Sequence, residues 1–335
     1  HGPDAKTRKA DLRLDLKEGI LGVVEPGDLV ASELVARITT TDLDDRMPPP
    51  EHSEALDAGE ISTLSRWVAG GAIWQGHWSF TTPQLPEIPD QNRHNPIDAF
   101  IDERIAAAGL TANGPATPET LIRRLHLDLI GLPPELQRAA RFVQDHEKDP
   151  EGAWHQLVDE VLASDRFGER WASVWLDLAR YGDTNGYHND SHRDMWPWRD
   201  WVIKALNDDM PWDRFIREQL AGDEMVPPPY TGLDPEQVDK LTATGFLRMA
   251  PDGTGSGANN TAAQNQVMAE TLKIVSTSLM GMTVGCAQCH DHRYDPILQS
   301  DYYKLRAVFE PALDPANWRM PQSRQISLFT EADRK

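Results

Sequence analysis

The chain has 335 residues, with 53 acidic and 33 basic side chains that give a formal net charge of −20. Hydrophobic residues make up 39% and the mean hydropathy is −0.54, so we expect a packed core beneath a strongly polar surface. The acidic balance excludes the basic footprint of a nucleic-acid-binding protein. No apolar run reaches the ~18 residues that would predict a transmembrane helix.

The length exceeds that of a typical single domain, so two domains are expected. Residues 1–80 are predicted to form the smaller one. A helical signal, ADLRLDLKEG, covers residues 10–19, and apolar spacing predicts helices over 32–39 and 58–72. The prolines of TTDLDDRMPPPEH predict an extended segment between the last two helices.

A proline-rich stretch, TTPQLPEIPDQNRHNP, predicts a linker over residues 81–95. Residues 96–335 then read as a larger, multi-helix domain. Its first helix has Asn95 as a predicted cap with proline at the first helical position, and the next has Thr117 in the same role.

Helix follows helix through this second domain, and no long alternation of apolar and polar residues predicts a strand. The fold class is therefore mainly α. Further helices are predicted at GAWHQLVDEVLAS, RFGERWASVWLDLARYG, MWPWRDWVIKALNDDM, PWDRFIREQLAGD and residues 261–282, with 274–285 read as a buried helical segment.

Eleven tryptophans are a high number for this length. Five of them, Trp171, Trp175, Trp196, Trp198 and Trp201, lie in one segment. Such rings usually build a core, but they also form cofactor walls and sugar-stacking platforms.

Both cysteines of the chain, Cys286 and Cys289, stand three positions apart, and His290 follows them directly. This C-x-x-C-H pattern is typical of c-type haem attachment, in which both thiols bind the haem vinyl groups and the histidine binds iron. A redox dithiol would be expected beside a βαβ unit, which the chain does not predict. A zinc site of Cys286, Cys289 and His292 would need a further ligand. Haem is favoured.

The residues after this motif leave two interpretations open. His292 could be a second metal ligand or a proton-transfer group beside the redox centre. Alternatively, Asp291 and Asp295 cap the following turn and His292 lies at the surface.

The stretches LIRRLHLDLIGLPP, RFGERWASVWLDLARYGDTNGY, TGFLRM and CAQCHDHRYDPI closely resemble the planctomycete and verrucomicrobial cytochrome c-type proteins. In these proteins a small cytochrome c-like domain precedes a larger helical domain of unknown function with its own CxxCH. The resemblance covers nearly the whole chain.

The resemblance also implies a first haem site. The opening HGPDAKTRKADLRLD is similar to the end of a first CxxCH motif, so His1 resembles its proximal histidine and both ends of the chain are expected to be cut. Met47, within an R-M-P-P stretch, resembles its distal ligand. A haem in this domain is expected only when its cysteines are present.

We therefore expect a periplasmic or otherwise extracytoplasmic electron-transfer protein with haem c at Cys286 and Cys289 and with redox proteins as partners. An oxidoreductase acting on polysaccharide-derived substrate is the alternative, and a zinc-bearing binding module the third. No catalytic acid–base pair stands out. The distal ligand of the second haem remains open among Met249, Met268, His188, His192 and His292.

Overall fold

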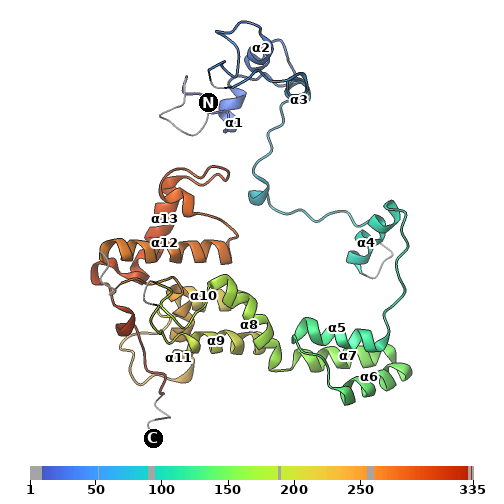
Figure 1. Ribbon diagram of the computed structural model, residues 1–335, viewed down its shortest axis with the longest axis vertical. Helices are drawn as coiled ribbons and strands as arrows, with labels where there is room; N and C mark the ends of the chain where they lie inside the picture. Colours follow the sequence, from blue (N-terminus) through green and yellow to red (C-terminus); the bar gives the residue numbers. More distant parts are fainter. Residues whose placement is uncertain are drawn as a thin grey trace. The chain divides into compact units, whose positions relative to one another are not determined.

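The computed structural model describes residues 10–51, 53–89, 95–187, 190–254, 260–330 and 333, and the chain is mainly α-helical as predicted (Figure 1). Its contacts divide it into two compact units, His1–Glu87 and Ile88–Lys335. No helix among the described residues is long and apolar enough to span a membrane.

The first unit contains three short helices around a small apolar core. These are α1 (Lys17–Leu21), α2 (Glu33–Thr39) and α3 (Ala58–Ala69), followed by the 3₁₀ turn η1 (Trp78–Phe80). The core consists of the buried residues Ile20, Val24, Val68 and Ala72. A reciprocal capping box begins α3, in which Asp57 accepts from the amide of Glu60 at 2.8 Å and Glu60 accepts from that of Asp57 at 2.8 Å.

The helix predicted over residues 10–19 is wrong for most of its length, because α1 begins only at Lys17. Ala10 and Asp11 have positive φ angles, which a helix does not allow. The chain instead folds back, so that the carbonyl oxygen of Arg13 lies 1.9 Å from where a Cβ of Gly19 would stand. Glycine thus permits a close backbone approach that overrides the local helical pattern.

The second unit is built from the remaining helices (Figure 1). They are α4 (Pro96–Ala107), α5 (Pro118–Leu129), α6 (Leu136–Lys148), α7 (Pro150–Leu162), α8 (Arg166–Ala179), α9 (Trp196–Asn207), α10 (Trp212–Ala221), α11 (Pro235–Ala243), η2 (Thr244–Arg248), α12 (Asn260–Leu279), η3 (Gly285–Gln288), α13 (Gln299–Leu313), η4 (Pro315–Asn317) and η5 (Pro321–Ser323).

The two predicted helix caps have different outcomes. Asn95 caps α4, because its side-chain oxygen accepts from the amide of Ile97 at 2.9 Å. Thr117 occupies the corresponding position before α5 but makes no capping bond to the backbone. Its hydroxyl instead lies 3.2 Å from that of Thr120, so the fixed φ of Pro118 starts this helix without a side-chain cap.

Helices α5, α6 and α7 pack on one another around a core of their own. Ile122, Phe142 and Leu157 are fully or almost fully buried at its centre. Arg138 of α6 and Glu160 of α7 are joined by an ion pair of 2.6 Å at its edge.

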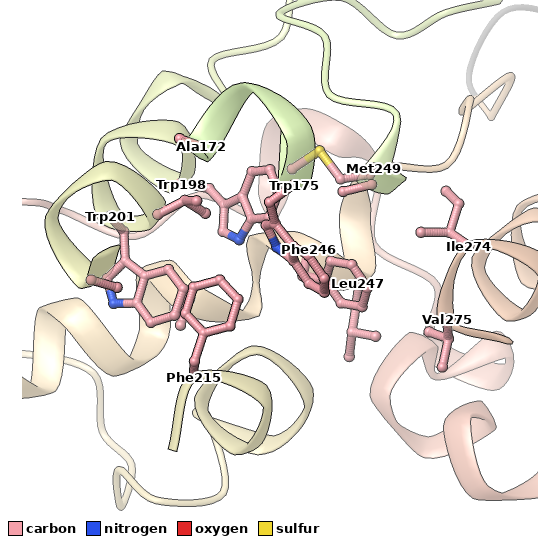
Figure 2. Close-up of a cluster of buried hydrophobic side chains, with 14 of the residues drawn as sticks. Ala172, Trp175, Trp198, Trp201, Phe215, Phe246, Leu247, Met249, Ile274 and Val275 are labelled. Carbon is pink, nitrogen blue, oxygen red and sulfur yellow. The ribbon is translucent and has the colours of Figure 1, made fainter. Parts of the chain in front are cut away.

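Aromatic side chains from α8, α9, α10 and η2 form the main core, as Figure 2 shows. The Trp175 ring stacks on Phe246 at a centroid distance of 5.8 Å, and Trp201 stacks on Phe215 at 5.3 Å. Trp198 is buried beside them, whereas Trp171 and Trp196 are exposed. The clustered tryptophans are therefore mainly core residues.

Helix α12 ends at Leu279, three residues before the predicted end. Gly281 adopts a φ of 62°, the left-handed conformation that commonly terminates helices. The predicted buried helix over 274–285 is thus helical only in its first part.

Candidate haem-attachment site

The CxxCH motif lies in the short connection between α12 and α13. The 3₁₀ turn η3 carries Cys286, and Cys289 follows directly after it. Both cysteines are free and exposed to solvent. Because side chains three apart eclipse one another in a 3₁₀ turn, the two thiols belong to the same face of the turn.

A second face of this turn is anchored in a small core between α12 and α13. Val284 and Ala287, again three residues apart, are 3% and 0% exposed. They pack with Leu272 of α12 and Tyr302 of α13. Burial raises the pKa of the Tyr302 hydroxyl. Because Val284 and Ala287 are held in this core, the turn cannot rotate, and the two cysteines are kept on a face that is exposed to solvent.

The N-terminus of α13 holds the turn from the side. The carbonyl oxygen of Gln288 accepts hydrogen bonds from the Gln299 side chain and from the Tyr303 hydroxyl, each at 3.2 Å. The carboxylate of Asp291 accepts from the amide of Gln299, the first residue of α13, at 2.8 Å. Gln299 and Tyr303 were not predicted as site residues; only the polar run QSD at residues 299–301 indicates that a helix begins there.

His290 is exposed, and its Nδ1 atom lies 2.8 Å from the carbonyl oxygen of Asp291. A carbonyl oxygen can only accept, so this contact assigns the ring proton to Nδ1. Nε2 then keeps its lone pair. Metal-binding histidines almost always donate their second ring N–H in this way.

His292 lies inside the loop, since its side chain is 6% exposed. Its Nδ1 accepts from the amide of Asp295 at 2.8 Å, and its Nε2 faces the Thr283 hydroxyl at 3.3 Å. The expectation of a surface position is therefore wrong. Ligation of a metal by His292 would break one of these contacts, which shape the loop after the motif.

The zinc alternative finds no support in the part of the chain that the structure describes, where no group of three or more His, Cys, Asp or Glu side chains is placed to hold a metal ion.

The other described candidates for the distal ligand lie on elements outside the CxxCH turn. Met249 is 2% exposed in the aromatic core, Met268 is buried on α12, and His192 pairs with Asp194 at 2.8 Å. His188 lies outside the described residues.

The proposed first site is described only at Met47. Its backbone amide donates to the carbonyl oxygen of Arg37 at 3.0 Å, and the residue is half-buried. His1 lies outside the described residues, so the pairing of His1 with Met47 stays a prediction.

The donor set at the second motif fits covalent haem. Two accessible thiols share one face of a turn, and the next residue is a histidine whose free nitrogen is the one that binds metals. Among the described residues, no other cysteine competes for these positions.

Comparison with known proteins defines the class. Residues 96–313 match the family described as "Protein of unknown function (DUF1549)", and residues 1–51 match the family described as "Planctomycete cytochrome C". The chain therefore belongs to the planctomycete cytochrome c-type proteins that carry a DUF1549 domain. No curated protein and no solved structure matches it.

Proposed function

We propose that the chain is an extracytoplasmic electron-transfer protein whose second domain carries one haem c on Cys286 and Cys289, with His290 as an iron ligand. The observation that carries this proposal is the Nδ1 contact of His290 with the Asp291 carbonyl, because it fixes the tautomer that binds iron through Nε2. Membership of the cytochrome c family supports haem c in general.

Haem c supplies a one-electron redox couple at iron. The residues of this chain hold and orient it. Val284 and Ala287 anchor the turn, α13 clamps it, and the thiols face solvent, where a partner protein could approach the redox centre.

We further propose that the redox partner presents a basic surface. The net charge of −20 favours association with a positively charged partner and speeds their encounter. Electron exchange with such a partner should slow as ionic strength rises, since salt screens charges beyond about 10 Å at 0.1 M.

The test is expression of the chain in a host with the cytochrome c maturation system. We expect one covalent haem per chain by pyridine haemochrome spectrum and haem stain. Because the sequence has two cysteines, this haem can be assigned to Cys286 and Cys289. The double substitution to alanine should abolish it.

His290→Ala should keep the thioether chemistry available but change the axial ligation, and so shift the Soret band and the reduction potential. His155→Ala is the matched control, because His155 lies exposed on α7. Absence of covalent haem, with one zinc per chain by elemental analysis, would overturn the proposal.

A further inference from the structure

A second cluster of charged residues lies away from the CxxCH turn, at the edge of the aromatic core. Three arginines gather there, each from a different segment. Arg193 comes from the loop between α8 and α9, Arg248 ends η2, and Arg324 follows η5. The carboxylate of Asp252 is 1% exposed among them.

This single carboxylate pairs with one of the three arginines. The Oδ2 atom of Asp252 lies 2.6 Å from Nη1 of Arg324. Its other oxygen, Oδ1, accepts from the amide of Thr254 at 2.9 Å and from the Thr254 hydroxyl. Among the described residues, no carboxylate lies within ion-pair distance of Arg193 or Arg248.

Arg193 and Arg248 instead donate to backbone carbonyls. Arg193 reaches the oxygen of Arg248 at 2.8 Å, and Arg248 reaches that of Ala312 at 2.8 Å. Burial lowers the pKa of Arg193 and lowers that of Arg248 to about 10. Asp252 and Asp183 oppose this shift at Arg193, and Asp252 and Asp223 oppose it at Arg248, but none of them forms an ion pair with either. A buried cation without a directly paired anion is costly, so two of the three guanidinium groups are only partly compensated.

Two donors of the cluster also have no hydrogen-bond partner among the described residues. They are Nε of Arg193 and Nη2 of Arg324, both shielded from solvent. Buried guanidinium donors without acceptors call for an ion or a water among them. The neighbouring Asp183 forms no ion pair with Arg193; its two oxygens accept from the Tyr181 hydroxyl at 2.6 Å and from the amide of Met195 at 3.0 Å.

We propose that the cluster of Arg193, Arg248 and Arg324 around Asp252 binds a small oxyanion: sulfate, phosphate or the carboxylate of a larger ligand. Such a group accepts several N–H bonds at once and matches the fork of a guanidinium. It would also supply the negative charge that Arg193 and Arg248 lack.

The segment Pro315–Arg324 closes over this cluster. The Trp318 indole donates to the Thr254 hydroxyl at 3.2 Å, and the Arg324 guanidinium lies 5.0 Å from the Trp318 ring centroid. An anion would therefore enter when this segment moves and would hold it closed once bound. Anion binding should stabilise the folded protein, because the unfolded chain has no such site.

The experiment is equilibrium dialysis of the purified chain with labelled sulfate, in sodium chloride of constant ionic strength. We expect saturable binding of one sulfate per chain and a rise in Tm that follows the same saturation. Arg193→Met should weaken binding at least about tenfold, because a charge-assisted hydrogen bond is lost. Arg199→Met is the control, since Arg199 is a partly exposed arginine paired with Asp200, and it should bind sulfate as the unchanged protein does.

Phosphate and acetate are then added as competitors of labelled sulfate. Stronger competition by phosphate indicates a site for a tetrahedral anion, and stronger competition by acetate indicates a site for a carboxylate. If Arg193→Met does not fold, Arg193→Lys takes its place, and it too should bind more weakly because lysine lacks the fork. Absence of saturable binding to the unchanged chain would overturn the proposal and leave buried water as the partner of these donors. An equal loss in Arg199→Met would also overturn it, since binding would then be a general surface effect.

Discussion

The indole nitrogen of Trp175 donates a 2.9 Å hydrogen bond to the side-chain oxygen of Gln219, which is 44 residues away in sequence. Gln219 is fully buried and its amide nitrogen in turn donates to the carbonyl oxygen of Phe215 at 3.0 Å. A polar side chain thus ties α8 to α10 in the middle of an aromatic core. Its amide can be buried there because both of its ends are paired.

Substitution Gln219→Leu should lower the free energy of unfolding by about 1–3 kcal/mol, because the Trp175 N–H loses its acceptor while it stays buried. Urea unfolding followed by tryptophan fluorescence measures this. Gln266→Leu, on an exposed position of α12, should change the free energy by less than about 0.5 kcal/mol. Equal unfolding midpoints for the two variants would contradict the role given to this hydrogen bond.

His126 makes the α5–α7 bundle sensitive to acid. Both of its ring nitrogens are buried without a partner among the described residues. Burial, and then the positive charge of Arg138, lower the pKa of His126, while Glu160 opposes them. The unfolded state therefore binds the proton more readily, so the free energy of unfolding should fall as the pH drops below the unfolded pKa of about 6.5.

His126→Leu should remove this part of the pH dependence and raise the free energy of unfolding at pH 5.5 by about 1 kcal/mol, because it replaces an unpaired polar ring with an apolar side chain. Urea unfolding followed by circular dichroism at pH 7.5 and 5.5 tests it. His155→Leu, on the exposed face of α7, is the control. If His126→Leu loses stability between these pH values as steeply as the unchanged chain, the assignment is wrong.

The sequence predicts most helices of the second domain because their signals are local. Proline at a first turn marks the starts of α4 and α5, and apolar spacing marks α7, α8 and α10. The helix over 10–19 failed for a non-local reason, since the contact of Arg13 with Gly19 decides the backbone there. Gly281 ends α12 early through a conformation that apolar spacing does not report.

The candidate site likewise contains residues that local sequence predicts and residues that only the fold brings together. Spacing alone predicts Cys286, Cys289 and His290, because the chemistry of haem attachment requires adjacent positions. The hydrogen bonds of Gln299 and Tyr303 to the Gln288 carbonyl oxygen depend on how α13 packs against the turn. No local sequence pattern indicates this packing. The arginine cluster collects side chains from positions as far apart as 193 and 324, and only the fold brings them together.

Gly168 lies where α8 packs closely against α9, with its amide donating to the Asn207 side chain at 2.7 Å. A Cβ at this position would stand 2.4 Å from the carbonyl oxygen of Ile203. Gly168→Ala should therefore force the two helices apart and lower the free energy of unfolding by about 1–3 kcal/mol. Gly114→Ala, where a Cβ meets nothing within 4 Å, should be neutral or slightly stabilising in urea unfolding. A stable Gly168→Ala would show that these helices can shift freely.

Ala287 connects the packing of the second domain to its candidate haem site, because it is fully buried on a different face of the turn from the thiols. Ala287→Leu adds a large side chain beneath η3, next to Tyr302, and should cost about 1–3 kcal/mol of stability. Since the turn must move away from α13 to make room, we also expect less covalent haem per chain. Gln288→Leu is the matched control, because this adjacent motif position is half-buried and not part of that core. A haem stain measures the covalent haem of each variant, and the midpoint of urea unfolding measures its stability. A full haem yield with lowered stability would show that the motif is loaded before the turn packs against α13.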